Sequence, residues 1–392
     1  MDLLERNGNA AEIMLDYVET NSTYQGETTM RVAARSYTDT GQWEAERELI
    51  FRRLPLLLAF SAELANPGDY KAMTVVGMPV LINRAKDGKV RAFLNVCSHR
   101  AAPVAADGTG NCARFVCPYH GWTFGQDGKL LGVADASKFG DVDKSTHGLR
   151  ELPCEERAGL IFAALTPGAD FDLEEHLGGY LPDLESLGLK DWAYLGSRTI
   201  EGANWKVAFD GYLEGYHFAQ LHPETIHPRT PSNTMHYEGF GMHQRIGFPQ
   251  RRIAEALGEV PREDWGNQEN NGYDYVRILF PNIAIFIAPE ITQIAQLYPG
   301  DTPGTNRTVL NYLRKDAAKD DEDKKALEGM MDFFADVTYG EDYVIGLEIQ
   351  KGLESGAHEE VVFGKNERGN QFFHEWVDWH LAKDATAPKP TM

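Results

Sequence analysis

Two short segments of the chain each combine a cysteine with a histidine. Residues 97–99 read CSH and residues 117–120 read CPYH, with seventeen residues between them. Two thiolates and two imidazoles can bind either a tetrahedral zinc ion or an iron–sulfur cluster in which histidines replace two cysteines on one iron. Alternation at a strand end puts Cys97 and His99 on one side, and a one-residue gap is short for a zinc finger. The spacing therefore favours a two-iron cluster held between two similar loops.

A second pair of histidines, His217 and His222, lies in residues 204–224 (NWKVAFDGYLEGYHFAQLHPE). On a straight helix the two would point ~140° apart, and spacing alone leaves surface or core histidines as an equal alternative. Pro223 follows directly, so we expect the helix to end there and the second imidazole to turn back toward the first. Two histidines and one carboxylate on one face are the ligand set of non-haem iron(II) enzymes.

Both segments resemble one known family. CSHR at residues 97–100 and CPYHGW at residues 117–122 resemble the cluster loops of Rieske proteins, in particular the Rieske non-haem iron oxygenases. NWK followed by E-x-Y-H-x4-H resembles the mononuclear-iron segment of the same oxygenases. The resemblance implies one Rieske [2Fe–2S] cluster and one mononuclear Fe(II) per subunit. Its cluster ligands would be Cys97, His99, Cys117 and His120, and its iron ligands His217 and His222.

The third iron ligand must be a distant carboxylate. Residues 336–355 (DVTYGEDYVIGLEIQKGLES) resemble the acidic turn of the family followed by EIQKGL, and this alignment implies Asp342 as the ligand. Asp336, Glu341 and Glu348 are rival candidates. Carboxylates are also common in the first turn of a helix, so an exposed acidic helix start is the alternative interpretation of residues 341–342.

Two more carboxylates precede the first histidine of the second pair. Glu214 and Asp210 stand three and seven residues before His217, so a continuous helix would place all three on one stripe. Carboxylates there suit a metal site, because they orient imidazole ligands. In the resembling enzymes the residue at position −3 connects to a Rieske histidine of the neighbouring subunit, here Glu214 and His120. The resemblance therefore implies a ring-shaped homotrimer, with Glu214 as a catalytic residue. The helical stripe adds Asp210 as a further catalytic candidate.

The helices and strands that position these residues are expected to form an α+β fold. The resemblance implies an all-β Rieske domain over residues 56–167 and a catalytic domain over residues 168–392, with a helix-grip (START-like) fold around a central antiparallel sheet. Residues 1–55 are expected to form a helical segment that packs on the catalytic domain. Asp-Gly pairs at residues 87–88 and 127–128 predict two β-hairpins in the Rieske domain.

Hydrophobic periodicity predicts the other elements. Strands are expected within residues 158–165, 273–298 and 309–314, and helices over residues 43–53, 204–222, within 315–353 and 372–381. Residues 225–270 are interpreted as a long polar connection, and the tail at residues 385–392 (ATAPKPTM) as disordered.

Composition narrows the function. The chain has 392 residues, with 38 basic and 59 acidic side chains and a formal charge of −21. This charge argues against nucleic acid or an anionic membrane as partner. The sequence shows neither a signal peptide nor an apolar run of the ~18 residues that span a bilayer, so a cytoplasmic protein is expected. Four cysteines do not make a disulfide scaffold, and Cys112 and Cys154 are expected to be inert.

These observations predict a terminal oxygenase component. A G-x-G-x-x-G loop is missing from the sequence, so electrons from NAD(P)H are expected to arrive through a separate ferredoxin or reductase. An aromatic or polycyclic compound is the first choice of substrate for reaction with O2. Because E-x-Y-H also resembles the branch that oxidises choline-like and betaine-like amines, demethylation or hydroxylation of a quaternary or tertiary amine is the alternative. A β subunit is a further expected partner in some members of the family.

Other interpretations remain open at this point. The chain could be a Rieske electron-transfer protein without a catalytic iron, or a zinc-stabilised interaction protein. A substrate pocket is expected from apolar residues near the iron, and a substrate carboxylate would need a buried arginine. The candidates for these two roles are Phe209, Phe218, Leu221, Ile285 and Ile294 for the pocket, and Arg245 and Arg277 for the carboxylate.

Overall fold

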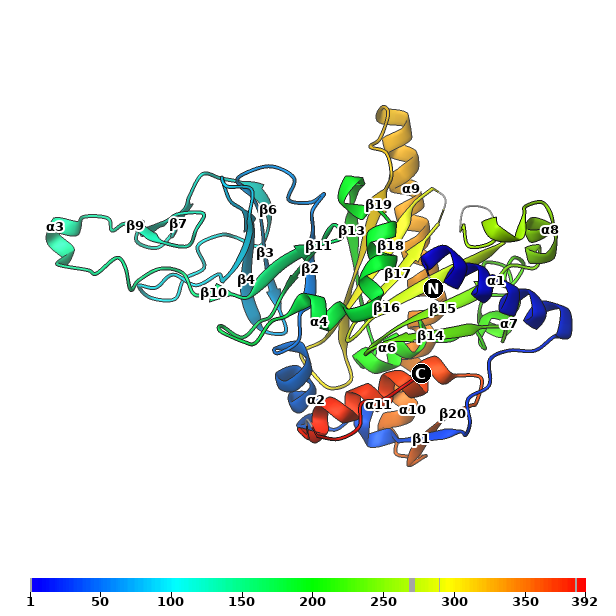
Figure 1. Cartoon of the computed structure of the whole chain (residues 1–392). Helices are drawn as coiled ribbons and strands as arrows, with labels where there is room; N and C mark the ends of the chain where they lie inside the picture. Colours follow the sequence, from blue (N-terminus) through cyan, green and yellow to red (C-terminus); the bar gives the residue numbers. More distant parts are fainter. Residues whose placement is uncertain (1, 268–271, 289, 385) are drawn as a thin grey trace. The chain divides into compact units, whose positions relative to one another are not determined.

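The computed structural model describes residues 2–267, 272–288, 290–384 and 386–392. The chain divides into two compact units, which are coloured along the sequence in Figure 1. The large unit contains Met1–Glu46, Leu177–Asp183 and Leu195–Met392, and the small unit contains Arg47–His176 and Leu184–Tyr194. The domain limits expected from the sequence stay a prediction.

The small unit is built from three antiparallel sheets. Five strands follow the order β10-β5-β4-β3-β6, and two sheets of three strands follow the orders β11-β12-β2 and β7-β8-β9. The elements are β2 (Leu56–Phe60), β3 (Asp69–Val75), β4 (Met78–Arg84), β5 (Val90–Leu94), β6 (Gly108–Asn111), β7 (Phe115–Val116), β8 (Thr123–Phe124), β9 (Leu130–Gly132), α3 (Ala136–Phe139), β10 (Glu151–Leu152), β11 (Cys154–Arg157) and β12 (Leu160–Ala163).

The two Asp-Gly hairpins of the small unit are confirmed. The first joins β4 to β5, and the second joins β8 to β9. Gly88 and Gly128 have φ angles of 79° and 77°. Only glycine adopts this left-handed conformation without a steric cost, which is why these dipeptides mark tight turns.

The large unit contains one antiparallel sheet of seven strands in the order β13-β19-β18-β17-β16-β15-β14. Its strands are β13 (Ala193–Gly202), β14 (His236–Phe240), β15 (His243–Pro249), β16 (Tyr273–Leu279), β17 (Ile283–Ile287), β18 (Thr292–Pro299) and β19 (Asn306–Arg314), and β1 (Met30–Ala33) pairs with β20 (Glu360–Phe363). The helices are α1 (Leu3–Thr20), α2 (Thr40–Glu46), α6 (Trp205–Asp210), α7 (Phe218–Leu221), α8 (Ile253–Gly258), α9 (Asp321–Val337), α10 (Val344–Glu354) and α11 (Arg368–Ala382). The chain passes between the units in α4 (Leu173–Leu177) and α5 (Leu181–Ser186).

Helices of the large unit pack on this sheet. Helix α6 contacts β18 and β19, and α1 contacts β14 and β15. Phe373 of α11 packs edge-on against Trp205 of α6, with 5.5 Å between ring centroids. Strands and helices without a regular βαβ alternation confirm the expected α+β class.

Three local predictions were wrong. Residues 204–222 form two short helices, α6 and α7, because glycines interrupt the chain at residues 211 and 215. Residues 225–270 contain β14, β15 and α8. Strand β15 is buried along its whole length, polar residues included, so the alternation that marks a half-buried strand is absent there. None of the described tail residues is buried, but the tail contacts α11, where Trp379 Nε1 donates to the Ala387 carbonyl at 3.2 Å. The strands expected within residues 273–298 and 309–314 and the helix at residues 372–381 are confirmed.

Candidate metal centres

The two cysteine–histidine loops of the small unit have the same backbone design. Cys97 N–H donates to the Ala102 carbonyl and Cys117 N–H to the Trp122 carbonyl, both at 2.8 Å. Each cysteine carbonyl also accepts a bond from the fourth residue along, which has a positive φ of 62° in Ala101 and 69° in Gly121. Loop one follows β5, and loop two connects β7 to β8. The structure thus contains the two similar loops that the spacing predicts.

The four side chains of these loops are suited to a two-iron cluster. Cys97 and Cys117 are buried, and the rings of His99 and His120 lie 4.7 Å apart between centroids. The Nδ1 atoms of both histidines are buried without a hydrogen-bond partner among the described residues. Buried polar atoms are nearly always paired, so two unpartnered nitrogens beside two thiols fit the ligand set of such a cluster. Trp122 is buried and stacks on His99, at 4.9 Å between centroids.

Helix α6 brings the second histidine pair into position. Asn204 caps this helix, accepting a hydrogen bond from Lys206 N–H at 2.8 Å. The Lys206 ammonium is fully buried in an ion pair with Glu46, which also accepts from Trp205 Nε1 at 2.7 Å. Because an unpaired buried lysine is costly, this ion pair fixes the start of the helix. The three residues of the NWK sequence, Asn204, Trp205 and Lys206, therefore anchor the start of α6.

A tight bend separates α6 from the histidines. A Cβ atom on Gly215 would lie 2.8 Å from the Phe218 ring and 2.9 Å from the Phe248 ring, so a larger residue does not fit. His217 immediately precedes α7, and His222 immediately follows it with a non-helical backbone (φ −116°, ψ 46°). The expected turn before Pro223 is confirmed, and it brings the two imidazole centroids to 5.0 Å.

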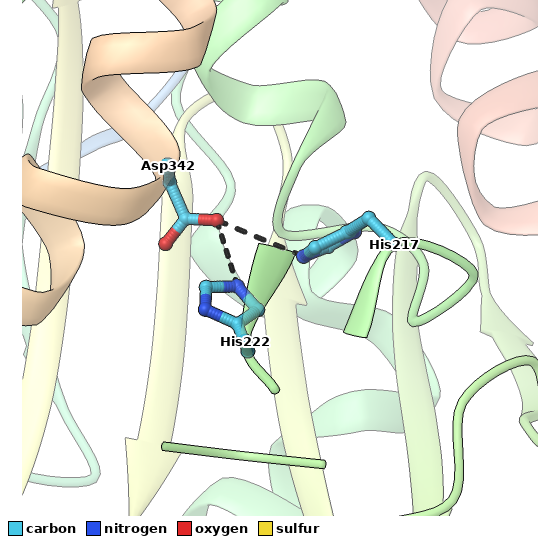
Figure 2. Close-up of side chains that lie close together, drawn as sticks. All are labelled: His217, His222 and Asp342. Carbon is cyan, nitrogen blue, oxygen red and sulfur yellow. Dashed lines mark hydrogen bonds and ion pairs between the residues drawn. The ribbon is translucent and has the colours of Figure 1, made fainter. Parts of the chain in front are cut away.

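Asp342 completes this group of side chains, as Figure 2 shows. Its Oδ1 atom lies 3.0 Å from His222 Nε2 and 3.6 Å from His217 Nε2. One ligand atom from each residue lies within 4.8 Å of the other two, close enough to share one metal ion. Asp342 is in a π-helical segment, Thr338–Tyr343, between α9 and α10. Single π-helical turns occur often at functional sites.

The Nδ1 atoms of both histidines face carboxylates. His217 Nδ1 is bonded to Glu214 and His222 Nδ1 to Glu341, whose Oε2 also accepts from Thr225 Oγ1 at 2.7 Å. Each carboxylate fixes the proton on Nδ1 and leaves the Nε2 lone pair for a metal, an arrangement typical of metal-binding histidines. Glu341 was expected only as a rival ligand, and its bond to His222 was not visible in the sequence.

The other rival carboxylates lie elsewhere. Asp336 is exposed on α9, and Glu348 is paired with Lys351 at 2.6 Å on the surface of α10. Of the four acidic candidates, the structure brings only Asp342 to the Nε2 side of both imidazoles.

Two family models match the chain. Residues 55–148 match the Rieske [2Fe-2S] domain, and residues 189–383 match the catalytic domain of the ring hydroxylating alpha subunit. The chain is a Rieske oxygenase alpha subunit. The expected family, fold class and enzyme class are thereby confirmed, and members of this family carry a Rieske cluster and a mononuclear iron. They receive electrons from reductase or ferredoxin partners and form multimers.

Relatives of this oxygenase act on different substrates. The carnitine monooxygenase oxygenase subunit of Escherichia coli (strain K12) is 28% identical over 342 residues, which cover 83% of this chain and 84% of that protein. The anthranilate 1,2-dioxygenase large subunit of Burkholderia cepacia is 33% identical over 202 residues, which cover 49% of this chain and 48% of that protein. A crystal structure of a quaternary ammonium Rieske monooxygenase with L-carnitine has the same fold, with a TM-score of 0.75 and 23% identity. The match covers 89% of this chain and 95% of that one.

Asp210 of the oxygenase lies away from the two imidazoles. The broken helix removes the predicted stripe, and Asp210 instead accepts from the Tyr37 hydroxyl at 3.0 Å and pairs with His374 Nε2 at 2.9 Å. Asn370 Nδ2 donates to its backbone carbonyl at 3.0 Å. The structure therefore connects Asp210 to α11 and to the segment before α2, whereas Glu214 stays beside His217.

A cavity of about 360 Å³ in the large unit opens beside the three converging side chains. Most of its walls are apolar, and the lining includes Phe218, Val276, Ala284, Phe286, Phe248, Phe333, Phe334 and Val337. Of the pocket residues expected from the sequence, only Phe218 is among them. Ile285 points to the other face of β17, because side chains alternate along a strand and Ala284 and Phe286 face the cavity. Phe209 packs against Phe373 instead.

The two arginines expected to bind a substrate carboxylate have other partners. Arg245 is fully buried and pairs with Asp183 and Glu238, both at 2.6 Å. Arg277 pairs with Asp183 at 2.5 Å. Neither is in the lining of the cavity, because both arginines stand at strand positions that face away from it, and their expected role is wrong. The arginine at the cavity is Arg229, whose Nη2 bonds to Asp274 at 2.9 Å.

Burial changes the pKa of several other groups of the oxygenase. Burial raises the pKa of Cys154 to about 12 and also raises the pKa of Cys112, which favours the protonated form of both thiols. Burial lowers the pKa of His222, but its bonds to Asp342 and Glu341 raise it more, so the net pKa is above the ordinary value. None of the described helices is long and apolar enough to cross a membrane.

Proposed function

We propose that this oxygenase hydroxylates or dihydroxylates an uncharged ring compound in the cavity beside His217, His222 and Asp342. One observation carries the proposal: the three side chains converge at the edge of a cavity whose walls are mostly apolar. Such a cavity favours a hydrophobic ligand held close to the reacting centre.

The ligand assignments are part of the proposal. Cys97 and Cys117 would hold one iron of the cluster, and the Nδ1 atoms of His99 and His120 the other, because these nitrogens are buried and unpartnered. The Nε2 atoms of His217 and His222 and one oxygen of Asp342 would hold the mononuclear iron. When bound, these metals supply electron transfer and the activation of dioxygen.

The protein's own side chains orient the imidazoles, exclude water and connect the two metal sites. Glu214 and Glu341 keep the Nδ1 protons in place, so that both imidazoles stay in the tautomer with a free Nε2. Phenylalanines of α7, β15, β17 and α9 exclude water from the cavity and orient an apolar ring. Glu214 is also proposed to connect His217 with His120 of a neighbouring subunit in a homotrimer, as the family resemblance implies.

The charge of the cavity supports an uncharged substrate. Away from the metal-site residues, the charged groups among its described lining residues are Arg229 and Asp274, and they neutralise one another. Gln250 Nε2 also donates to Asp274 at 2.9 Å. A charged substrate would have to break this pair or remain without a partner, which is costly in an apolar site.

A quaternary amine is the second candidate. Carnitine and glycine betaine monooxygenases are among the relatives, and the aromatic side chains of the cavity could surround a trimethylammonium group. In that case Arg229 would leave Asp274 to bind the substrate carboxylate. The rest of the reaction scheme would be the same.

Oxygen uptake tests the two candidates. The protein is purified without oxygen, its iron and sulfide are counted, and NAD(P)H-driven oxygen uptake with a ferredoxin and reductase is measured on a panel of bicyclic aromatics, ketones, carnitine and betaines. About three irons and two sulfides per chain and a hydroxylated ring product are expected. Release of trimethylamine or formaldehyde would favour the second candidate. Two irons per chain without any substrate oxidation would contradict both.

A further inference from the structure

Gln293 stands out in the wall of the cavity. It is the one side-chain amide among the described residues that line it, and only 8% of the residue is exposed. It lies on β18, directly opposite Phe286 of β17 and Tyr312 of β19. With Val276, which pairs with Phe286, these residues form one row across the sheet on the cavity side. A polar group therefore interrupts an apolar wall at a defined position.

Tyr312 fixes the orientation of this amide. Its hydroxyl donates to Gln293 Oε1 at 3.1 Å, and the Tyr312 side chain is fully buried. Because Oε1 is the acceptor of this bond, Nε2 is the end of the amide that remains for the cavity. Nε2 has no hydrogen-bond partner within the described ranges 2–267, 272–288, 290–384 and 386–392. The two N–H groups of Gln293 Nε2 therefore remain for the cavity, and the bond from Tyr312 to Oε1 holds the amide in this orientation.

An amide donor in these surroundings needs an acceptor. Phe286 lies opposite Gln293 in the sheet, and Ala284, Phe334 and Val337 also line the cavity. Gln293 lines the cavity, where its Nε2 can meet water, and a ligand acceptor that replaces this water gives orientation and specificity. The one arginine among the described lining residues, Arg229, is already paired with Asp274, so an anionic acceptor would have to compete with that carboxylate.

We propose that Gln293 donates a hydrogen bond to an uncharged oxygen acceptor of the substrate, of which a ring ketone is the simplest form. This inference rests on the proposed function and narrows its substrate class from uncharged ring compounds in general to those that carry a carbonyl group. Gln293 is the specificity-determining residue, and Tyr312 is a positioning residue that acts through it. The hydrogen bond anchors one edge of the ring and thereby fixes which carbon faces the metal site.

A matched pair of ligands tests the hydrogen bond. 1-Tetralone and tetralin differ in one carbonyl group, and their binding to the anaerobic holoenzyme is measured by calorimetry without turnover. The wild-type protein is expected to bind 1-tetralone at least about tenfold more tightly than tetralin. Equal affinities for the two ligands would overturn the proposal, since they would mean that water satisfies the amide equally well.

Two variants locate the effect. Gln293→Leu is expected to reduce 1-tetralone affinity to the level of tetralin, while tetralin binds at least as tightly because leucine adds apolar surface. Tyr312→Phe is expected to lower the ketone preference by about threefold, since the amide can then rotate. Gln25→Leu, an exposed glutamine of the large unit, serves as the control and should keep the full preference. A parallel loss of both ligands in Gln293→Leu, with an unchanged melting temperature, would overturn the proposal.

The binding assay and the turnover assay fail independently. A ketone preference in a protein that oxidises no ring compound would sink the proposed function but support the role of Gln293 as a donor. Oxidation of tetralin and 1-tetralone with equal affinity would support the proposed function and sink the role of Gln293.

Discussion

The histidines of the small unit and those of the large unit present opposite ring nitrogens to their sites. In the cluster loops the buried Nδ1 atoms of His99 and His120 have no partner among the described residues. At the second site the Nδ1 atoms of His217 and His222 are bonded to carboxylates, and Nε2 faces Asp342. Nδ1 lies close to the backbone, so a tight loop is enough to aim it. Nε2 lies at the far end of the ring, so a second side chain must hold the ring in place.

The two sites also differ in how much of the chain is needed to build them. Each cluster loop is closed by backbone bonds between residues that are at most five apart. The third side chain of the other site comes from 120 residues after His222. The cluster loops are therefore self-contained, while the second site depends on tertiary packing between α7 and the segment before α10. Variants at the two sites are expected to reveal this difference. The expected effects run from complete loss of the mononuclear iron to a small change in the reduction potential of the cluster.

The largest effect is expected from the distant carboxylate. Asp342→Ala should remove the mononuclear iron and abolish detectable oxygen uptake, because two imidazoles alone do not complete the facial set. The cluster should remain, since its ligands lie in the other unit. Iron analysis should fall from about three to two per chain, while the visible spectrum of the cluster is unchanged.

Asp336→Ala is the matched control for this experiment. Asp336 is an exposed acidic residue six positions earlier in the chain, and its loss should change neither iron content nor oxygen uptake. If Asp336→Ala lowers the iron content and Asp342→Ala does not, the proposed ligand set is wrong.

A smaller loss is expected from the carboxylate behind His222. Glu341→Ala should weaken iron binding by about 10–100-fold, because the imidazole loses the partner that fixes its tautomer. Glu341→Gln should recover part of this loss, since its amide oxygen can still accept the Nδ1 proton. Anaerobic titration of the metal-free protein with Fe(II) measures the affinity. An affinity equal to that of the wild type in Glu341→Ala would mean that His222 needs no such partner, as in the cluster loops.

The cluster site could be predicted from the sequence because its order is local. The fixed gaps between Cys97 and His99 and between Cys117 and His120 reflect two short loops with the same hydrogen bonds, and local geometry of this kind is visible in a sequence. The α+β class could also be inferred, since Asp-Gly pairs mark hairpins and amphipathic segments mark helices. The ligand roles themselves remain proposals.

The cavity and the carboxylate partner of His222 could not be predicted because they depend on tertiary contacts, whereas Glu214 is near His217 in the sequence. The face of β17 that lines the cavity is set by pairing with β16 and β18, so Ile285 was chosen where Phe286 lies. The bond between His222 and Glu341 joins residues 119 apart. The apolar period over residues 204–222 predicts one helix, whereas the glycines at residues 211 and 215 favour a break, and the structure contains two short helices.

A third kind of histidine shows that an orphaned nitrogen alone does not make a metal site. His380 of α11 is stacked on Phe280 at 5.4 Å, and its buried Nε2 has no partner among the described residues. Burial, with a smaller contribution from Lys389, lowers its pKa to about 4. The unfolded chain, with an ordinary pKa of ~6.5, then binds more protons between these values, so stability decreases as the pH falls through this window.

His380→Gln should therefore flatten the pH dependence of stability. Between pH 7 and pH 4.5 the variant is expected to lose less of its free energy of unfolding than the wild type, by about 1–2 kcal/mol after allowance for partial solvent exposure. Urea unfolding at several pH values measures the difference. The exposed His358 provides the control variant His358→Gln, whose pH dependence should equal that of the wild type. Parallel curves for His380→Gln and the wild type would show that His380 is not held neutral by burial.

The smallest effect is expected at the rim of the cluster loops. Phe139 of α3 lies edge-on to His99 at 5.3 Å and to Trp122 at 5.6 Å, although 47% of the residue is exposed. An oxidised cluster with two thiolates and two neutral imidazoles carries no net charge, and reduction makes it negative. Phe139→Ala admits water beside His99, which stabilises the negative form, so the reduction potential should rise by less than the 59 mV of a tenfold change. Leu131→Ala, another exposed apolar residue of the same unit, should leave the potential unchanged in a redox titration. A lower potential in Phe139→Ala would mean that water access does not control the cluster, and the self-contained loops alone would then set its chemistry.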